Sequence, residues 1–322
     1  MRSLFALFGT LLVATSNHAE SLPTFHVGHS SRTATHIVLV KTDDAGKGKF
    51  RVVESWKGDL KPDAALSIPG LAKDAKGDMV LFLKRDSKPE EGDEWKPAGI
   101  GSEWRVAVAW LDGDTVSAVE QLNNPGPAEV MPIDYIKSRK AFRQMVDYYV
   151  NSDRAFDTAR AIKDPQKRVD AFSAIINGQN NRKEEAFSEL GQCGPKAVPV
   201  LRKVLESKPN HDHKYAVPAL AQAGGRDVVP ELAKMIDAEV TWWADAGPKL
   251  KKGWWFNTDC EAWKRHGRLW ALVEVCRTYP TTELRKQVVA VRDLMRNLPT
   301  VDADKGIGSM SAHCEEVLKE GD

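Results

Sequence analysis

The sequence predicts a chain of two parts: a small all-β domain over residues 20–130 and a domain of stacked helices over residues 131–322. Three observations predict this. Short β-branched and alternating runs fill the first part, apolar residues at helical spacing fill the second, and all 4 cysteines lie in the second. The charge divides in the same way, with a net of −4 over residues 20–130 and +4 from Met131 onward. We expect the boundary at residues 123–127, Asn-Asn-Pro-Gly-Pro, a run of turn formers.

The composition is that of an ordinary globular protein. The 322 residues are 42% hydrophobic and 28% charged, which excludes intrinsically disordered and fibrous classes. A formal net charge of +1 excludes a chain-wide basic surface for nucleic acid. After the N-terminal segment, no stretch reaches the roughly 18 apolar residues that a membrane span needs.

Residues 1–19 have the pattern of a secretory signal peptide. A short basic start precedes an apolar run from Leu4 to Ala14, which is too short to span a bilayer. Small and polar residues follow, and we expect cleavage after Ala19, with Ser16 as the alternative. A buried N-terminal helix is the other interpretation of this run. The predicted localisation is secreted or periplasmic, after removal of the signal peptide.

Five or six strands are expected between residues 20 and 130. A turn of Asp and Gly residues at 43–48 predicts a hairpin between the first two. Residues 78–84 are apolar throughout their middle, which indicates a strand covered on both faces. The expected strands are residues 35–41, 49–56, 78–84, 103–111 and 115–119. Without a helix-period stretch between them, they predict a small closed barrel or sandwich.

Two of these strands carry a resemblance to a known family. Trp56-Lys57-Gly58 ends a valine-containing strand, and a later glycine-led strand runs from Gly77 to Leu83. This order resembles the OB-type barrels of the netrin-module and metalloproteinase-inhibitor superfamily, and it implies a secreted OB-like barrel. The inhibitors act through an N-terminal cysteine and a disulfide frame, and residues 20–130 contain no cysteine. The resemblance therefore implies fold and export, not protease inhibition.

The second part contains four amphipathic stripes. Apolar residues fall at i, i+3, i+4 and i+7 in stretches that begin at Phe142, Ala197, Val229 and Leu269. No comparable strand pattern occurs there, so this part is expected to be helical.

Two of the helical stretches belong to a repeat of about 30 residues. Leu190 corresponds to Leu220, and Val198-Pro199 corresponds to Val229-Pro230. In each copy a glycine ends the first helix, and proline lies in the first turn of the second, where its missing N–H is harmless. The pattern resembles the short HEAT-like repeat family. That resemblance implies an α-α superhelix, a HEAT-like solenoid of three or four helix pairs.

The candidate metal and catalytic motifs are weak. No Gly-x-Ser-x-Gly, His-Glu-x-x-His or P-loop pattern occurs, so no catalytic residue, metal or cofactor is expected. His211 and His213 could hold a metal, although Asp212 between them also suits the start of a helix. His26 and His29 could bind copper or zinc near the mature N-terminus, although an unstructured leader also explains them.

A tryptophan-rich stretch is the strongest candidate for a binding site. Six of the 10 tryptophans lie between residues 242 and 270, and residues 249–268 carry a net charge of +4. The predicted recognition patch consists of Trp242, Trp243, Lys251, Lys252, Trp254 and Trp255. We expect the two tryptophan pairs to be partly exposed and to meet across a loop tip at residues 251–253. The other interpretation is an insertion whose indoles pack onto the helices while its lysines face water.

The cysteines allow three disulfide connectivities. Cys260 and Cys276 flank one expected helix and would lie about 24 Å apart, beyond bridging distance. We therefore expect a bridge between Cys260 and Cys314, with Cys193 and Cys276 as buried thiols.

These features together predict an exported, non-enzymatic binding or scaffold protein. It would contact a protein partner, or an anionic peptide or glycan, through the solenoid and its tryptophan-rich insertion. The alternative is an enzyme or enzyme accessory of lyase or hydrolase type, because some short HEAT-like repeats belong to chromophore lyases. A cavity that holds converging titratable groups would favour the alternative.

Overall fold

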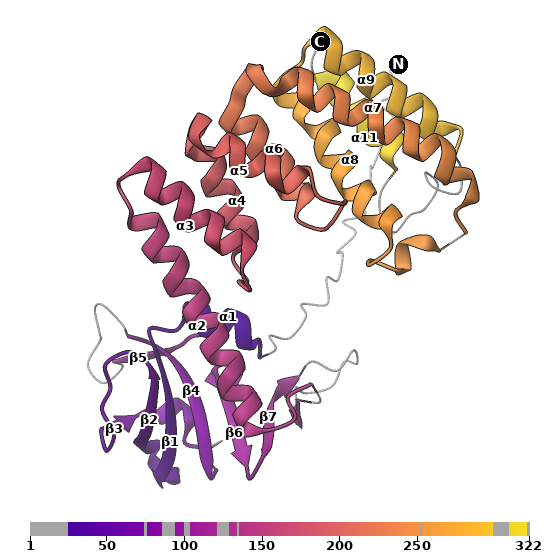
Figure 1. Cartoon of the computed structure of the whole chain (residues 1–322). Helices are drawn as coiled ribbons and strands as arrows, with labels where there is room; N and C mark the ends of the chain where they lie inside the picture. The colour runs from indigo at the N-terminus through magenta and orange to yellow at the C-terminus, as the bar shows by residue number, and fades with distance from the viewer. Residues whose placement is uncertain are drawn as a thin grey trace, which may run out of the picture. The chain divides into compact units, whose positions relative to one another are not determined.

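A computed structural model of the chain describes residues 25–73, 76–85, 94–99, 104–120, 129–133, 135–251, 253–298 and 309–320. The predicted leader and the predicted boundary at 123–127 lie outside these residues. The chain forms two compact units, Met1–Asp147 and Tyr148–Asp322 (Figure 1). Within the described stretches, no helix combines the length and the apolar character that crossing a membrane requires.

The first unit is built on one antiparallel sheet. Its strands follow the order β3-β2-β1-β4-β6-β7-β8, and β5 pairs with β4. The strands are β1 His36–Asp44, β2 Lys49–Lys57, β3 Ala65–Ser67, β4 Asp78–Arg85, β5 Trp95–Pro97, β6 Val108–Asp112, β7 Thr115–Glu120 and β8 Glu129–Pro132. The expected hairpin is confirmed, because β1 and β2 pair antiparallel across a short 3-10 turn. The prediction of a strand covered on both faces at residues 78–84 is also confirmed, because every residue of β4 from Met79 to Leu83 is buried.

One expected strand is wrong in its first half. Residues 103–111 alternate as a strand would, yet Trp104–Ala107 forms a 3-10 turn and β6 begins only at Val108. The Trp104 indole lies directly over Gly70, where an added Cβ would come within 2.3 Å of its Cδ1. Packing of this ring on a neighbouring turn replaces the extended backbone that the alternation predicts.

Helix α2, Arg139–Ala161, begins in the first unit. Phe142 near its start is fully buried, and its ring centroid lies 5.9 Å from that of Trp56 and 6.4 Å from that of Phe82. The two compact units therefore divide inside α2, between Asp147 and Tyr148. The first turns of α2 belong to the core of the sheet, which the linker composition of residues 123–127 does not reveal.

The segment before β1 is also folded. Val27–Thr33 forms the short helix α1, with His26 at its N-cap position and His29 inside it. Phe25 packs edge-on against Phe82, with centroids 5.4 Å apart. The expectation of an unstructured leader around His26 and His29 is thus wrong from Phe25 onward.

The Trp56-Lys57-Gly58 segment turns sharply against the first strand. Gly58 has a φ of 93°, and a Cβ there would lie 2.2 Å from Cδ2 of His36, so only glycine fits. His36 Nε2 lies 2.7 Å from Oδ1 of Asp59. This hydrogen bond is the main reason that the pKa of Asp59 lies below its usual value.

The second unit consists of helices in the part of the chain that the structure describes. The helices are α3 Pro165–Asn177, α4 Lys183–Gln192, α5 Val198–Leu205, α6 His213–Gly224, α7 Val229–Ala246, α8 Glu261–Thr278, α9 Thr282–Arg296 and α11 Met310–Glu320. All four predicted stripes fall on helices. Leu201, Leu232 and Leu272 illustrate this, because each is fully buried.

The two repeat copies have the same connector. Gly194–Ala197 joins α4 to α5, and Gly225–Val228 joins α6 to α7, both as 3-10 turns. Gly194 and Gly225 have φ values of 67° and 57°, in the left-handed region that favours glycine. The prolines of Val198-Pro199 and Val229-Pro230 lie in the first turns of α5 and α7, as expected.

Helices α4, α6 and α8 lie side by side and run in the same direction. Lys183 at the start of α4 pairs with Asp212, the residue before α6, at 3.7 Å. Lys214 near the start of α6 lies beside Gly267 of α8. Towards the helix ends, the Tyr279 hydroxyl donates to the Ala221 carbonyl at 3.1 Å.

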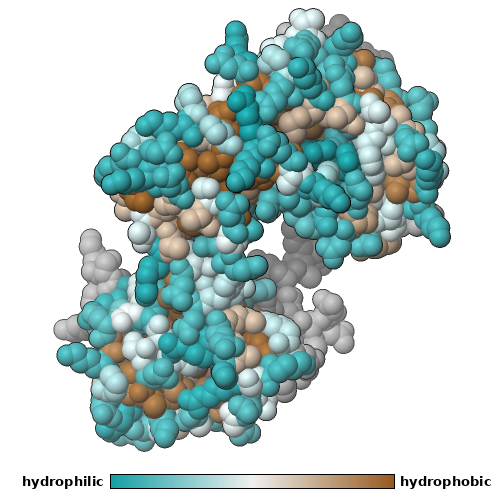
Figure 2. All heavy atoms as spheres, viewed as in Figure 1, coloured by the Kyte–Doolittle hydropathy of each residue, from teal (hydrophilic) through white to brown (hydrophobic). Residues whose placement is uncertain are grey.

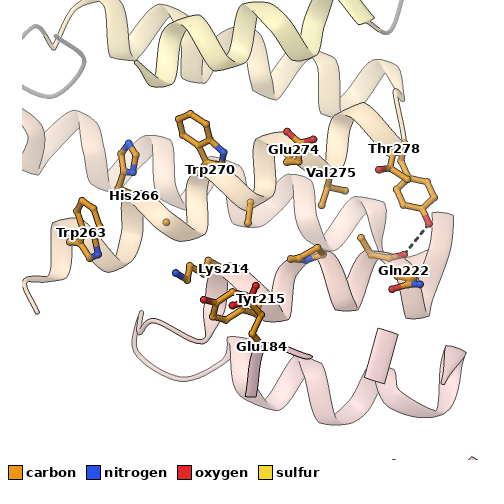
Figure 3. A pocket seen from close by; sticks show the side chains of 15 residues that line it. Glu184, Lys214, Tyr215, Gln222, Trp263, His266, Trp270, Glu274, Val275 and Thr278 are labelled. Carbon is orange, nitrogen blue, oxygen red and sulfur yellow. Dashed lines mark hydrogen bonds between the residues drawn. The ribbon is translucent and has the colours of Figure 1, made fainter. Parts of the chain in front are cut away.

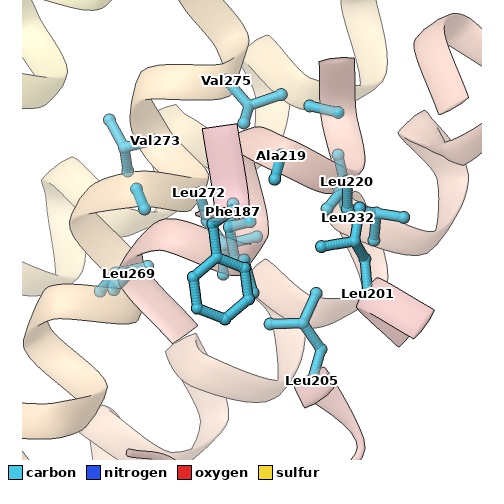
Figure 4. Packing of buried hydrophobic residues seen from close by; sticks show 14 of the residues in the cluster. Phe187, Leu201, Leu205, Ala219, Leu220, Leu232, Leu269, Leu272, Val273 and Val275 are labelled. Carbon is cyan, nitrogen blue, oxygen red and sulfur yellow. The ribbon is translucent and has the colours of Figure 1, made fainter. Parts of the chain in front are cut away.

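One hydrophobic core runs through these helices (Figure 4). The approach of α4 to α6 is close, because a Cβ at Gly191 would lie 2.5 Å from Oε1 of Gln222 and 3.2 Å from Cα of Ala219. On the face shown in Figure 2, hydrophilic side chains predominate and the apolar ones gather in patches between them.

Candidate functional site

The predicted recognition patch is mostly core. Trp243 has no exposed surface, and Trp254 and Trp255 are each 8% exposed. Trp242 is half-buried, Lys251 is exposed, and Lys252 lies outside the described residues. The expectation that all four indoles are partly exposed is therefore wrong, and the packed-insertion interpretation holds for three of them.

The tryptophan pairs do meet, as the loop between them predicted. The Trp243 and Trp254 centroids lie 5.7 Å apart, and each ring also contacts its sequence neighbour edge-on. The guanidinium of Arg265, on α8, lies 4.6 Å from the Trp242 centroid. The pairs meet because the indoles close over the hydrophobic core, and this contact removes them from solvent.

The predicted disulfide is also wrong, because Cys260 and Cys314 are not bridged to each other. Cys260 caps the start of α8: its sulfur accepts from the Trp263 amide at 3.4 Å and donates to the Trp254 carbonyl at 3.7 Å. Cys314 lies in the core on α11. Burial raises the pKa of the Cys193 and Cys276 thiols.

The histidine pair at 211 and 213 does not form a metal site. Asp212 is the N-cap residue of α6, and His213 points into the core, where its Nε2 lies 3.1 Å from the Val204 carbonyl. His211 is exposed. Within the described part of the chain, no group of three or more His, Cys, Asp and Glu side chains is placed to hold a metal ion.

The strongest candidate site is a groove along α4, α6 and α8 (Figure 3). It has a volume of about 980 Å³. Its walls include Glu184 of α4; Lys214, Tyr215, Pro218, Ala221 and Gln222 of α6; and Trp263, His266, Gly267, Trp270, Ala271, Glu274, Val275 and Thr278 of α8, with Tyr279 just beyond. Aromatic rings and small residues thus dominate it, as in most sites that bind organic ligands.

Helix α8 supplies a stripe of aromatic side chains to the groove. Trp263, His266 and Trp270 follow one another at i, i+3 and i+7 and so share one helix face. The His266 centroid lies 6.5 Å from that of Trp263 and 6.0 Å from that of Trp270. Leu269, Leu272 and Val273 of the same helix are fully buried. The helix therefore has two apolar faces, one for the core and one for the groove.

Trp270 is held from behind by α11. The His313 ring stacks on its indole with centroids 3.8 Å apart and an interplanar angle of 5°. His313 Nε2 also lies 3.5 Å from Oε2 of Glu274, one turn beyond Trp270. Burial lowers the pKa of His313, so the ring is neutral at pH 7.

A buried ion network lies on the core side of α8. The fully buried Glu239 of α7 accepts from Arg268, and from Arg265 at 3.1 Å. Arg268 in turn lies 3.4 Å from Nδ1 of His213. Burial lowers the pKa of His213 to about 4 and that of Arg268 to about 10. Paired charges of this kind link α6, α7 and α8 beneath the groove.

The arrangement favours binding over catalysis. The groove's ionised side chains, Glu184, Lys214 and Glu274, come from three different helices, and Figure 3 shows the two glutamates on opposite walls. Such groups do not converge on one reacting atom. The sequence contained a signal for this site, because Trp263 and Trp270 lie on the same face of an amphipathic helix, but the density of tryptophan is highest at the two pairs.

Comparison with models of known protein families, with curated proteins and with solved structures finds no match to this chain.

Proposed function

We propose that this chain is an exported binding protein whose HEAT-like helical domain holds an extended polypeptide segment of a partner in the groove of α4, α6 and α8. The observation that carries the proposal is the groove itself. Five aromatic rings, of Tyr215, Trp263, His266, Trp270 and Tyr279, line about 980 Å³ of space beside only a few charged groups. Rigid aromatic side chains are the usual anchors of protein recognition.

The arrangement of the helices supports the HEAT-like assignment. The helices α4, α6 and α8 are parallel neighbours, and the helix that follows each of them begins after a short turn. Helices α7 and α9 are also parallel, because Gln287 donates to Asp237 at 3.2 Å and Gly247 lies against Leu298 at the far ends. In this proposal the groove is one face of a stack of helix pairs, the face on which such arrays bind extended ligands.

The groove geometry suits a peptide backbone as well as side chains. Pro218 lies in the middle of α6 and is exposed in the groove wall. Since proline has no N–H, it cannot donate to the Lys214 carbonyl one turn earlier. The Lys214 carbonyl therefore lacks the i+4 hydrogen bond that a regular helix would give it.

For the first unit we infer an OB-like barrel related to the netrin-module superfamily. The antiparallel order of its strands and the tight turn at Gly58 support this inference. The leader pattern of residues 1–19 supports export.

Panning of a phage-displayed library of 12-residue peptides against the full chain tests the groove. We expect recovered peptides to lose binding when Gly267→Leu places a side chain in the groove wall. A Cβ at Gly267 meets only ordinary contacts, with Lys214 at 3.8 Å, so the variant should fold. Ala244→Leu, at an exposed position of α7, is the matched control and should bind normally. Recovery of no peptide, or of peptides that bind Gly267→Leu unchanged, would exclude this function.

A further inference from the structure

We propose that the Trp270–Glu274 end of the groove is a subsite for a positively charged side chain, arginine or lysine, of the bound segment. The inference rests on the proposed function, and it names the chemistry of the ligand. It also replaces the anionic partner that the predicted Lys251–Lys252 patch implied.

The Trp270 indole offers a cation a preformed aromatic face. His313 stacks on one face of the indole, with ring centroids 3.8 Å apart and an interplanar angle of 5°. It does not cover the opposite face. The stack also fixes the ring, since the buried His313 belongs to another helix. A guanidinium or ammonium group over the face of a tryptophan is attracted by the ring quadrupole, most strongly where water is partly excluded.

Glu274 places a carboxylate beside this ring. It follows Trp270 at i+4 on α8, so their Cβ atoms are about 5–6 Å apart on one helix face. One cation can therefore contact the indole and the carboxylate together. The Glu274 side chain is 47% exposed. Because His313 is neutral at pH 7, it does not cancel the charge of Glu274.

The present partner of Glu274 can be exchanged. Its Oε1 lies 3.0 Å from Nε of Arg277, in an i, i+3 pair at the surface. Exposed pairs of this type contribute about 0–1 kcal/mol, so a ligand guanidinium with bidentate geometry can compete with Arg277.

The remaining charges of the groove favour a cation at this end. Lys214 is the one lysine or arginine among the described lining residues, and its Nζ lies 4.6 Å from the centroid of the adjacent Tyr215 ring. The Cβ and Cδ atoms of its side chain lie beside Gly267, which is about 10 Å along α8 from Glu274. The opposite wall contributes Glu184, which is exposed. A cation bound at this end therefore meets the Glu274 carboxylate, where it would displace the Arg277 guanidinium, while Glu184 lies on the opposite wall.

A double-mutant cycle between protein and peptide tests the subsite. The probe is a fluorescently labelled synthetic peptide with the consensus sequence recovered by panning, compared with the same peptide in which glutamine replaces each Arg and Lys. Anisotropy titrations at pH 7.5 should show roughly tenfold weaker binding of the glutamine peptide to the wild type. Glu274→Gln should weaken the original peptide by a similar factor and leave the glutamine peptide unaffected, so that the two losses do not add.

Two further variants control for structure. Trp270→Phe keeps a ring for the stack on His313 and should weaken binding by a smaller factor than Trp270→Leu. Asp245→Asn removes an exposed carboxylate of α7 and should leave binding unchanged.

The outcomes separate the two proposals. Suppose that Gly267→Leu prevents binding of the recovered peptides, but that these peptides lack basic residues or bind Glu274→Gln as tightly as the wild type. The groove would then still be the peptide site, and the cation subsite would be excluded. If Gly267→Leu blocks no peptide, both proposals fail.

Discussion

Two groups of tryptophans, neighbours in the sequence, have opposite positions in the helical unit. Trp243, Trp254 and Trp255 are buried and complete the core, whereas Trp263 and Trp270 are half-buried and line the groove. His266 contacts rings of both groups, with centroids 6.0 Å from Trp254 and 6.0 Å from Trp270. The density of tryptophan in a segment therefore says little about recognition, because the same residue type serves as core and as binding surface a few turns apart.

The difference between the groups comes from helix periodicity. On α8 the stripe of apolar residues that begins at Leu269 packs into the core. The indoles on another face of the same helix therefore do not pack into the core and line the groove. Trp254 and Trp255 follow Gly253 in a short 3-10 turn. Such a turn has no repeating pattern of apolar residues that would indicate which side chains face the core. A tryptophan on the second face of an amphipathic helix is thus the better pointer to a surface site.

The largest expected effect is the difference in unfolding free energy between replacing a core tryptophan and replacing a groove tryptophan. Trp243→Ala should lower the free energy of unfolding by about 3–5 kcal/mol, because it opens a cavity in a fully buried cluster. Trp263→Ala, at a half-buried position, should lower it by only about 1–2 kcal/mol. Urea denaturation followed by circular dichroism at 222 nm measures both. Equal losses for the two variants would contradict the assignment of one ring to the core and one to the groove.

Acidification should destabilise the core side through His213. The folded chain holds the pKa of this histidine at about 4, below the ordinary 6.5, so between these values only the unfolded chain binds the proton. Stability is therefore full above pH 6.5 and falls by on the order of 3 kcal/mol as the pH drops to 4. His313, whose pKa is also lowered, changes stability in the same direction.

Replacement of His213 isolates its share of this pH dependence. His213→Gln keeps an N–H donor toward the Val204 carbonyl but cannot titrate in this range. Denaturation midpoints measured from pH 7.5 to 4 should fall less steeply for this variant than for the wild type. The same slope in both proteins would show that His213 is accessible and titrates normally.

The smallest expected effect compares two glycines on parallel helices. Gly267→Ala should stabilise the protein by about 0.5–1 kcal/mol, because it removes a flexible residue from α8 and its Cβ meets only ordinary contacts. Gly191→Ala should instead destabilise it by about 1–3 kcal/mol, since its Cβ would press on Gln222 and Ala219 of α6. Thermal melts of the two variants give the comparison. Shifts of the same sign would mean that the wall at Gly267 is as tightly packed as the α4–α6 contact.

Local patterns predicted most of the elements. The strands β1, β2, β4 and β7 and the helices α2, α7 and α8 all fall where period and turn residues placed them. The repeat connectors did so as well, because glycine and proline restrict the backbone regardless of what surrounds them. The wrong assignments include the first half of the strand at 103–111, the unstructured leader before β1, the exposure of Trp243, Trp254 and Trp255, and the bridge between Cys260 and Cys314.

The sequence by itself determined an antiparallel sheet followed by amphipathic helices, since both depend on residues close together along the chain. Only the tertiary structure decided that Trp270 faces a groove and Trp243 does not, that Cys260 caps α8 without a bridge to Cys314, and that His213 is buried beside Arg268. Each of these depends on which helix packs beside which. Contacts between α6, α8 and α11 join residues that are far apart in the sequence. The spacing of side chains within one helix does not predict such contacts.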